Sequence, residues 1–215
     1  MKKIKGLTIL VTLGLSLFSS SLVTHAETVD GQSTGEVQIN GSIGKLDNTN
    51  PETTLPEGFD DWINVSLDTA TLFHTTSASN HGEIESANYS IQNLSGRGVA
   101  VYISEMSGSP LYVDSLVINP IEVESLVDQP KAVNLLMDGE LATGMQNSIW
   151  LKLANNQNQL EIGNSSQNYG NQVSFNYTGT TRNLPIDANS ISYQENYVMT
   201  LRFESIAADG IAIGN

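Results

Sequence analysis

Short segments of alternating apolar and polar residues dominate this chain from Phe59 onward, and no segment after the first 26 residues keeps the 3.6-residue period of a helix. Successive side chains of an extended strand point to opposite faces, so this alternation indicates strands with one buried face. Clusters of Gly, Asn and Ser separate the segments and supply turns. The pattern predicts an all-β sandwich or barrel. We expect an antiparallel β-sandwich, immunoglobulin-like or jelly-roll-like.

Two segments show the alternation most clearly, at residues 62–67 and 196–205. The apolar faces are Ile63, Val65 and Leu67 in the first, and Tyr197, Met199, Leu201 and Phe203 in the second. Further strands are expected at 36–43, 111–118, 132–137, 148–154, 159–163 and 172–178. One helical turn is expected within 122–128.

Residues 86–105 are predicted to form a β-hairpin. Residues 95–98 read Ser-Gly-Arg-Gly, and glycine adopts a positive φ at no steric cost. Apolar residues at Val99, Val101 and Ile103 then follow with period 2. The expected turn therefore joins two neighbouring strands.

The first 26 residues have the layout of a secretory signal peptide. Three lysines precede the apolar run 7–18, which is too short to span a bilayer as a helix. Thr24 and Ala26 occupy the −3 and −1 places of a cleavage site. We expect export and a mature chain that begins at Glu27.

The mature chain divides into two parts by composition. Residues 27–58 are polar and contain Pro51 and Pro56, so they are expected to be an N-terminal segment and linker. Residues 59–215 are expected to form the β-sandwich domain. No sorting signal or apolar tail is visible after Phe203, so retention at a surface is expected to be non-covalent, through an apolar patch rather than the acidic surface.

The net charge limits the classes of molecule that this chain can bind, and its cysteine content indicates the kind of cell that exports it. Three of the nine basic residues lie in the first 26, so the rest of the chain carries six basic and 23 acidic residues, a formal charge of −17. Such a surface repels the phosphates of nucleic acid and of anionic lipids. The chain has no cysteine. An exported protein without disulfides is typical of a Gram-positive bacterium.

No motif for a specific reaction, metal or cofactor is present. His74, His81, Glu83 and Glu85 could offer zinc ligands, but they are spread over a polar tract, and a solvated loop is the simpler interpretation. The sequence has no Gly-x-Ser-x-Gly elbow, calcium loop or dinucleotide fingerprint. We therefore expect no catalytic residues and no cofactor.

Aromatic residues are the remaining binding candidates. Trp62 and Trp150 could stack on sugar rings, although a tryptophan in an alternating strand more often belongs to the core. Phe203, the last aromatic residue of the expected strand at 196–205, is the third candidate.

Residues 86–107 read SANYSIQNLSGRGVAVYISEMS, and residues 197–203 read YVMTLRF. The first segment resembles the first half of the WxL surface domain of low-GC Gram-positive bacteria, with a strand, a Gly/Arg turn and a second strand. The last segment looks like the closing strand of that family. The resemblance covers roughly 60–207 and is carried by pattern more than by identity.

The two Trp-x-Leu signatures of that family are replaced here. Val99 and Val101 stand at the first, and Phe203 and Ser205 at the second. The resemblance implies non-covalent association with the cell wall and work beside other surface proteins. We expect a secreted, non-enzymatic cell-surface protein that binds protein partners, peptidoglycan or another wall polymer. The alternative is a secreted hydrolase of wall glycan or peptide.

Overall fold

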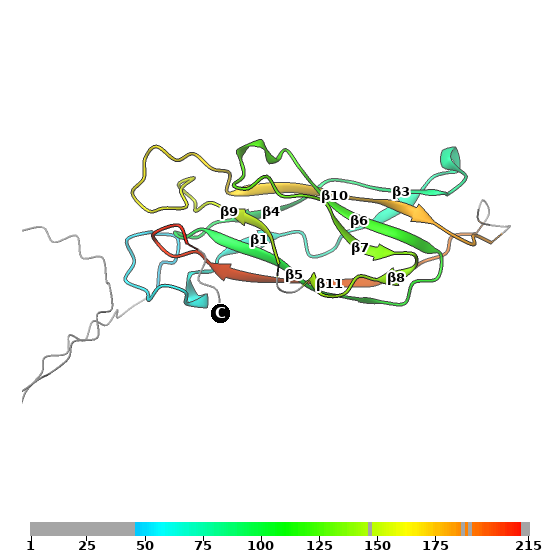
Figure 1. Cartoon of the computed structure of the whole chain (residues 1–215), viewed down its shortest axis with the longest axis horizontal. Helices are drawn as coiled ribbons and strands as arrows, with labels where there is room; N and C mark the ends of the chain where they lie inside the picture. The colour runs from blue at the N-terminus through cyan, green and yellow to red at the C-terminus, as the bar shows by residue number, and fades with distance from the viewer. Residues whose placement is uncertain (1–45, 146–147, 186–187, 189–190, 212–215) are drawn as a thin grey trace, which may run out of the picture. The chain divides into compact units, whose positions relative to one another are not determined.

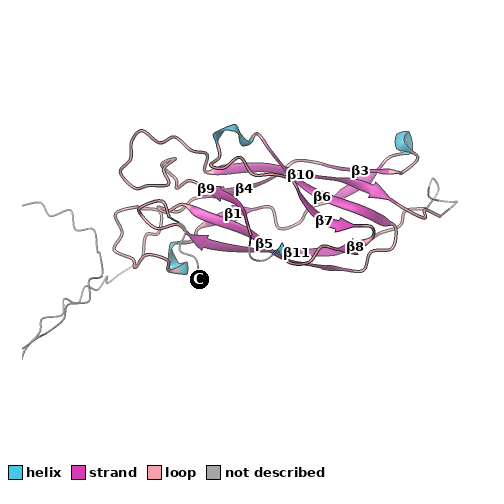
Figure 2. Cartoon of the chain, in the orientation of Figure 1, coloured by secondary structure: helices cyan, strands magenta, loops and turns pink. Residues whose placement is uncertain are grey.

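The computed structural model describes residues 46–145, 148–185, 188 and 191–211. The predicted signal peptide and the predicted strand at 36–43 lie outside these residues. The described part is built from strands and loops, with short 3₁₀ turns and no α-helix (Figure 2). These turns include η1 (Asp60–Trp62), η2 (Ser77–Ser79) and η3 (Val123–Ser125). The last of these is the helical turn expected within 122–128.

Two antiparallel sheets form two layers (Figure 1), which confirms the predicted all-β sandwich. The central path of the large sheet runs in the order β1-β4-β10-β6-β7-β8, and β3 joins β2 to β10. Its strands are β1 (Val65–Leu67), β2 (Phe73–Thr75), β3 (Glu83–Ser86), β4 (Tyr89–Asn93), β6 (Val113–Ile121), β7 (Val133–Met137), β8 (Glu140–Leu141) and β10 (Gln172–Thr181). The small sheet has the order β11-β5-β9, with β5 (Val99–Gly108), β9 (Ile149–Leu153) and β11 (Tyr197–Ser205).

The main core lies between the two sheets. Each sheet contributes the inward-facing half of its alternating residues. The large sheet supplies residues such as Ile91, Leu116, Ile118 and Phe175, and the small sheet supplies Val99, Val101, Ile103, Trp150 and Leu153. The apolar face predicted for the final strand is confirmed, because Tyr197, Met199, Leu201 and Phe203 all pack against this core.

The central strand β5 is apolar on both sides. Residues 99–103 are all buried, so the strand does not alternate there. Ala100 and Tyr102 point away from the main core and pack with Leu160 and Ile206 in a second cluster. The long loop after β9 and the end of the chain therefore cover the outer face of the small sheet.

The predicted hairpin at 86–105 is wrong. β4 pairs with β1 and β10 in the large sheet, whereas β5 pairs with β9 and β11 in the small sheet. Residues 94–98 instead form a crossing loop that carries the chain from one sheet to the other. The physical reason is that β4 and β5 both contribute apolar residues to one core, and facing each other across it buries more apolar surface than lying side by side.

The glycines of the crossing loop are needed for close packing. Neither Gly96 nor Gly98 has a positive φ, contrary to the turn chemistry expected for them. A Cβ on Gly96 would lie 2.7 Å from the backbone nitrogen of Pro51, and one on Gly98 would lie 2.8 Å from a methyl of Leu160. The loop is therefore approached from both sides by other segments.

Other strand boundaries also differ from the predictions. Residues 159–163 form no strand and make only an isolated bridge between Glu161 and Asp209. The first strand begins at Val65, because residues 60–62 form a 3₁₀ turn. Strands β2, β3 and β8 were not predicted, since they are short and lack a clear apolar face.

Candidate functional site

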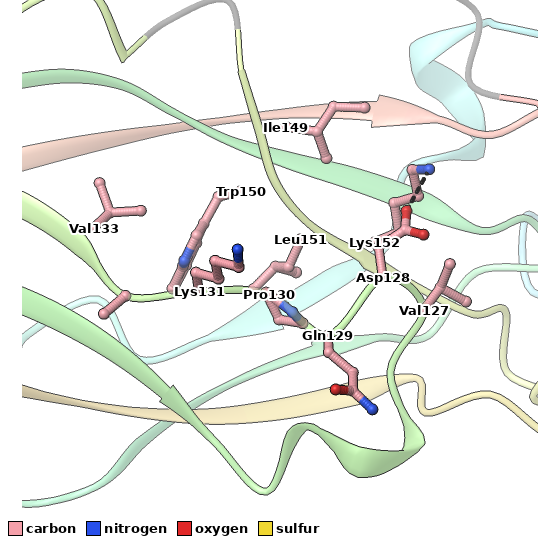
Figure 3. A pocket seen from close by; sticks show the side chains of 11 residues that line it. Val127, Asp128, Gln129, Pro130, Lys131, Val133, Ile149, Trp150, Leu151 and Lys152 are labelled. Carbon is pink, nitrogen blue, oxygen red and sulfur yellow. Dashed lines mark hydrogen bonds and ion pairs between the residues drawn. The ribbon is translucent and has the colours of Figure 1, made fainter.

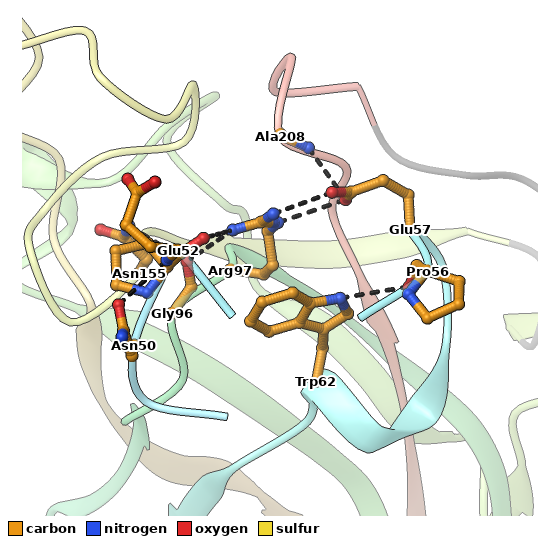
Figure 4. A network of polar contacts seen from close by, with 10 residues as sticks. Asn50, Glu52, Pro56, Glu57, Trp62, Gly96, Arg97, Asn155 and Ala208 are labelled. Atoms are coloured by element: carbon orange, nitrogen blue, oxygen red, sulfur yellow. Dashed lines mark hydrogen bonds and ion pairs between the residues drawn. The ribbon is translucent and has the colours of Figure 1, made fainter. Parts of the chain in front are cut away.

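Trp62 is fully buried and acts in packing. Its indole N–H donates to the Pro56 carbonyl at 3.2 Å, and the Arg97 guanidinium lies 4.1 Å from the ring centroid (Figure 4). One face of the ring is covered by a cation, so a sugar ring cannot stack there. Phe203 is partly buried in β11, opposite Val101, and packs against the main core.

Arg97 is the centre of the polar network around Trp62. Its guanidinium donates to both carboxylate oxygens of Glu57, at 2.8 and 3.2 Å, and to the Pro51 carbonyl at 2.7 Å. Glu57 also accepts the backbone N–H of Ala208 (Figure 4). The network therefore ties the crossing loop to residues 51–57, which the sequence predicted to be linker, and to the end of the chain.

The two histidines do not assemble a metal site in the part of the chain that the structure describes. His74 and Glu85 face each other across β2 and β3, with 3.6 Å between their side chains. The His81 ring makes a hydrogen bond of 2.9 Å with the Thr75 hydroxyl. Both histidines line a cavity, which we name the end groove.

The end groove has a volume of about 770 Å³. It lies where β2, the start of β11 and the segment 191–196 meet the end of the core. Its walls are aromatic and aliphatic, with a few hydroxyl, imidazole and carboxylate groups among them. The lining includes Leu72, Phe73, His74, His81, Met106, Tyr112, Tyr177, Ile191, Tyr193, Glu195, Tyr197 and Met199.

Aromatic pairs fix the walls of the end groove. Tyr112 and Tyr193 meet edge to face with 5.3 Å between ring centroids, and Phe73 and Tyr197 pack at 6.2 Å. Leu72, Ile191 and Tyr193 all remain exposed at its rim. A concave aromatic surface with an exposed apolar rim is typical of a binding site for another molecule.

Glu195 organises one wall of the end groove. Its carboxylate accepts the backbone N–H groups of Leu111 and Tyr112, at 3.1 and 2.6 Å, and the Tyr197 hydroxyl. Burial by itself raises the pKa of the Glu195 carboxyl, but these hydrogen bonds outweigh burial and hold the pKa below 4.5. Burial and the neighbouring Glu195 carboxylate raise the pKa of the Tyr197 phenol well above 10. Glu195 is thus a carboxylate whose oxygens already have donors.

A second cavity, which we name the strap pocket, lies between residues 127–133 and strand β9 (Figure 3). Its volume is about 440 Å³. We call residues 127–133 the strap. It is attached to β9 by a β-bridge between Val127 and Lys152 and by an ion pair of 2.9 Å between Lys152 and Asp128. Trp150 lines this pocket, whereas neither Trp62 nor Phe203 lines either cavity. The three aromatic candidates therefore do not form one site.

Sequence reasoning missed the end groove. The sequence feature that most clearly indicates this groove is Tyr193-Gln-Glu-Asn-Tyr197, where two tyrosines flank an acidic residue at the start of the final strand. That signal does not show which distant residues complete the walls. Tyr112 lies more than 80 positions away along the chain and meets Tyr193 only in the fold.

Comparison with known proteins adds no family assignment. No protein-family model matches this chain, and no curated protein sequence matches it. Within the residues that the structure describes, no helix is long and apolar enough to cross a membrane.

Proposed function

We propose that this chain is a secreted, non-enzymatic protein of the cell surface that binds a partner surface protein through the end groove. The observation that carries the proposal is the groove itself, with a volume of about 770 Å³ and an exposed aromatic and aliphatic rim. Tyrosine is enriched in protein interfaces because it combines a large apolar surface with one polar group. The signal-like first 26 residues and the WxL-like pattern support the location.

The chemistry of the groove favours binding over catalysis. A proton-transferring carboxyl needs a pKa near the working pH and access to its substrate. Glu195 has the opposite properties, because its pKa is lowered and its oxygens accept hydrogen bonds from Tyr197 and two backbone N–H groups. Its role is to hold the wall of the groove in place.

Attachment through this groove is expected to resist salt. At about 1 M salt the Debye length falls to about 3 Å, which screens exposed charge pairs but does not weaken apolar burial. The protein should therefore remain on cells washed with concentrated sodium chloride or a chelator, and should be released by denaturant.

Tyr193→Ser tests the proposal, because Tyr193 is 42% exposed at the rim and its removal leaves the core untouched. Phe59→Ser is the matched control, since Phe59 is 54% exposed and does not line the groove. We expect Tyr193→Ser to lower retention on washed cells about tenfold and Phe59→Ser to leave it unchanged. Equal retention of both variants would refute the groove as the binding surface. Release of soluble fragments from purified walls by the wild-type protein would instead establish the alternative, a wall hydrolase.

A further inference from the structure

The small sheet ends on one side in a strand with an unpaired edge. β11 is 9 residues long, and in the described part of the chain its only strand partner is β5. Natural proteins blunt such edges with lysine, proline or a bulge, because the free backbone groups can pair with another chain. β11 has neither lysine nor proline, and the extra residue at its register shift, Ser104, lies on β5. The edge is therefore in a form that can accept another strand.

The pairing register shows which backbone groups of β11 are free. Ile206, directly after the strand, donates its N–H to the Gly98 carbonyl at 2.7 Å, so these two residues form a hydrogen-bonded pair. Hydrogen-bonded and non-hydrogen-bonded pairs alternate along an antiparallel ladder. Counting back from Ile206, the backbone N–H and C=O groups of Phe203 and Leu201 point away from β5. No hydrogen bond to these groups is found among the described residues.

Apolar side chains beside this edge lack full cover. β11 lies on the β1 and β2 side of the sandwich, since the Tyr197 ring packs with Phe73 of β2 at 6.2 Å between centroids. Leu67 of β1 is paired with Ile91, and paired residues share a face, so both side chains point into the sandwich. Ile91 is fully buried, whereas Leu67 is 37% exposed. An inward-facing leucine that remains exposed indicates that the small sheet is too narrow to cover the large one here.

The surface at the C-terminal end of β11 is acidic. Glu57 accepts the Ala208 N–H (Figure 4), and η1, which follows Glu57, lies against β11. The η1 residues Asp60 and Asp61 are exposed, and neither carboxylate forms an ion pair within the part of the chain that the structure describes. A strand that carries lysine or arginine at this end therefore meets opposite charge, and an acidic strand is repelled.

We infer that the open edge of β11 pairs with an extended segment of another protein, apolar at every second position and basic at its N-terminal end. The segment runs antiparallel to β11, which places its N-terminal end beside Asp60 and Asp61. Its apolar residues lie opposite Leu201 and Phe203, bond to their free backbone groups and cover Leu67. A second copy of this chain fits less well, because two proteins of net charge −14 repel each other. This edge adjoins the end groove, yet its free backbone groups do not depend on what the groove binds.

The probe is the peptide acetyl-Lys-Lys-Val-Thr-Val-Thr-Val-amide, added to ¹⁵N-labelled residues 27–215 up to about 1 mM. For an added strand of this length we expect a dissociation constant on the order of 0.1 mM. The backbone amide signals of Leu201 and Phe203 should move and saturate. Hydrogen exchange of the same two amides should slow about tenfold at the highest peptide concentration, because the bound state protects them. The absence of a saturating shift at these amides would refute the inference.

Two N-methylated peptides test whether the contact is a backbone ladder. Opposite residues of an antiparallel pair share a face, so the N–H groups of the inward-facing valines point to β11 and those of the threonines point to solvent. Methylation of the three valine nitrogens should abolish binding, whereas methylation of the two threonine nitrogens should leave it unchanged. Equal binding of the two methylated peptides would exclude strand addition.

Protein variants test the acidic end and the place of binding. Asp60→Asn combined with Asp61→Asn should weaken binding about fivefold. Glu122→Gln combined with Glu124→Gln makes the same change of charge at exposed residues beside η3 and should have no effect. Equal effects of the two double variants would remove the acidic end from the recognition. Tyr193→Ser should bind the peptide as the wild type does, and loss of binding would place the peptide in the end groove instead.

Two results with the protein alone would also overturn the inference. Slow hydrogen exchange of the Leu201 and Phe203 amides in the monomer, before any peptide is added, would show that the edge is already paired. Dimerisation in sedimentation velocity, with protection of the same amides, would make a second copy of this chain the occupant.

Discussion

Replacing Arg97 by methionine tests whether the crossing loop holds the N-terminal segment and the end of the chain together. Methionine keeps the apolar stem and removes the guanidinium. The side chain of Arg97 is 7% exposed, and its ion pair with Glu57 is 2.8 Å long. The substitution removes two hydrogen bonds to Glu57, one to the Pro51 carbonyl, and the cation–π contact with Trp62.

The magnitude follows from burial. Removing one partner of a buried ion pair costs about 3–5 kcal/mol, because the other charge stays desolvated. The Glu57 side chain is 37% exposed, so it regains part of its hydration, and it keeps the hydrogen bond from Ala208. We therefore expect the lower end of that range, a loss of about 3 kcal/mol in the free energy of unfolding. For a domain of this size such a loss lowers Tm by about 6–12 °C.

Lys152→Met is the matched control. It makes the same change of charge and the same new side chain, and the ion pair that it removes, with Asp128, is 2.9 Å long. The difference is exposure, since Lys152 is 28% exposed and Asp128 is 70% exposed. An exposed pair of this kind contributes at most about 1 kcal/mol.

Urea unfolding of residues 27–215, followed by tryptophan fluorescence and by circular dichroism, measures both variants. Arg97→Met should lower the midpoint clearly more than Lys152→Met, with an unchanged dependence on urea concentration. Losses that agree within about 0.5 kcal/mol would refute the argument from burial. A neutral Arg97→Met would show that the network around Trp62 does not stabilise the fold.

Three further predictions concern the sheets, the crossing loop and the end groove. Gly179→Ala should destabilise the protein by about 3 kcal/mol in the same urea assay, because the new Cβ would lie 2.0 Å from the Ser115 carbonyl oxygen of the neighbouring strand. Asn93→Ala should cost about 3 kcal/mol, since the fully buried Asn93 amide donates to the Ala154 and Arg97 carbonyls and accepts the Ser95 backbone N–H, and of these three groups only the Arg97 carbonyl has a second partner, the Ser95 hydroxyl; an effect below about 1 kcal/mol would contradict this. The pKa of Glu195 is lower in the folded state, so its contribution to stability is fully present above pH 4.5 and is lost as the pH falls below 4.5 toward the folded-state pKa. Glu195→Gln should therefore be less stable than the wild type at pH 7, with a difference that narrows in acid, and Tyr197→Phe should reduce the acid dependence; a difference that stays constant between pH 7 and pH 3 would refute the assignment.

The sequence alone determined that the fold is all-β, where most of the longer strands lie and, for the last strand, which side is buried. The last strand is the clearest case, because the apolar set from Tyr197 to Phe203 was predicted and lies against the core. A strand with one buried face shows apolar residues at every second position, so a short stretch of sequence is enough to predict it. The short strands β2 and β3 escaped prediction because three or four residues carry too little of that period.

Only the tertiary structure decided which strands pair and which surfaces remain open. The segments 89–93 and 99–108 look like a hairpin in sequence, yet they belong to different sheets because both faces of residues 99–103 are covered by distant parts of the chain. The same distant contacts bury Trp62 under Arg97 and bring Tyr112 to Tyr193 in the end groove. Alternation fixes the direction of a side chain relative to its own strand, but the partner that it meets depends on the packing of the whole sandwich, which no local pattern encodes.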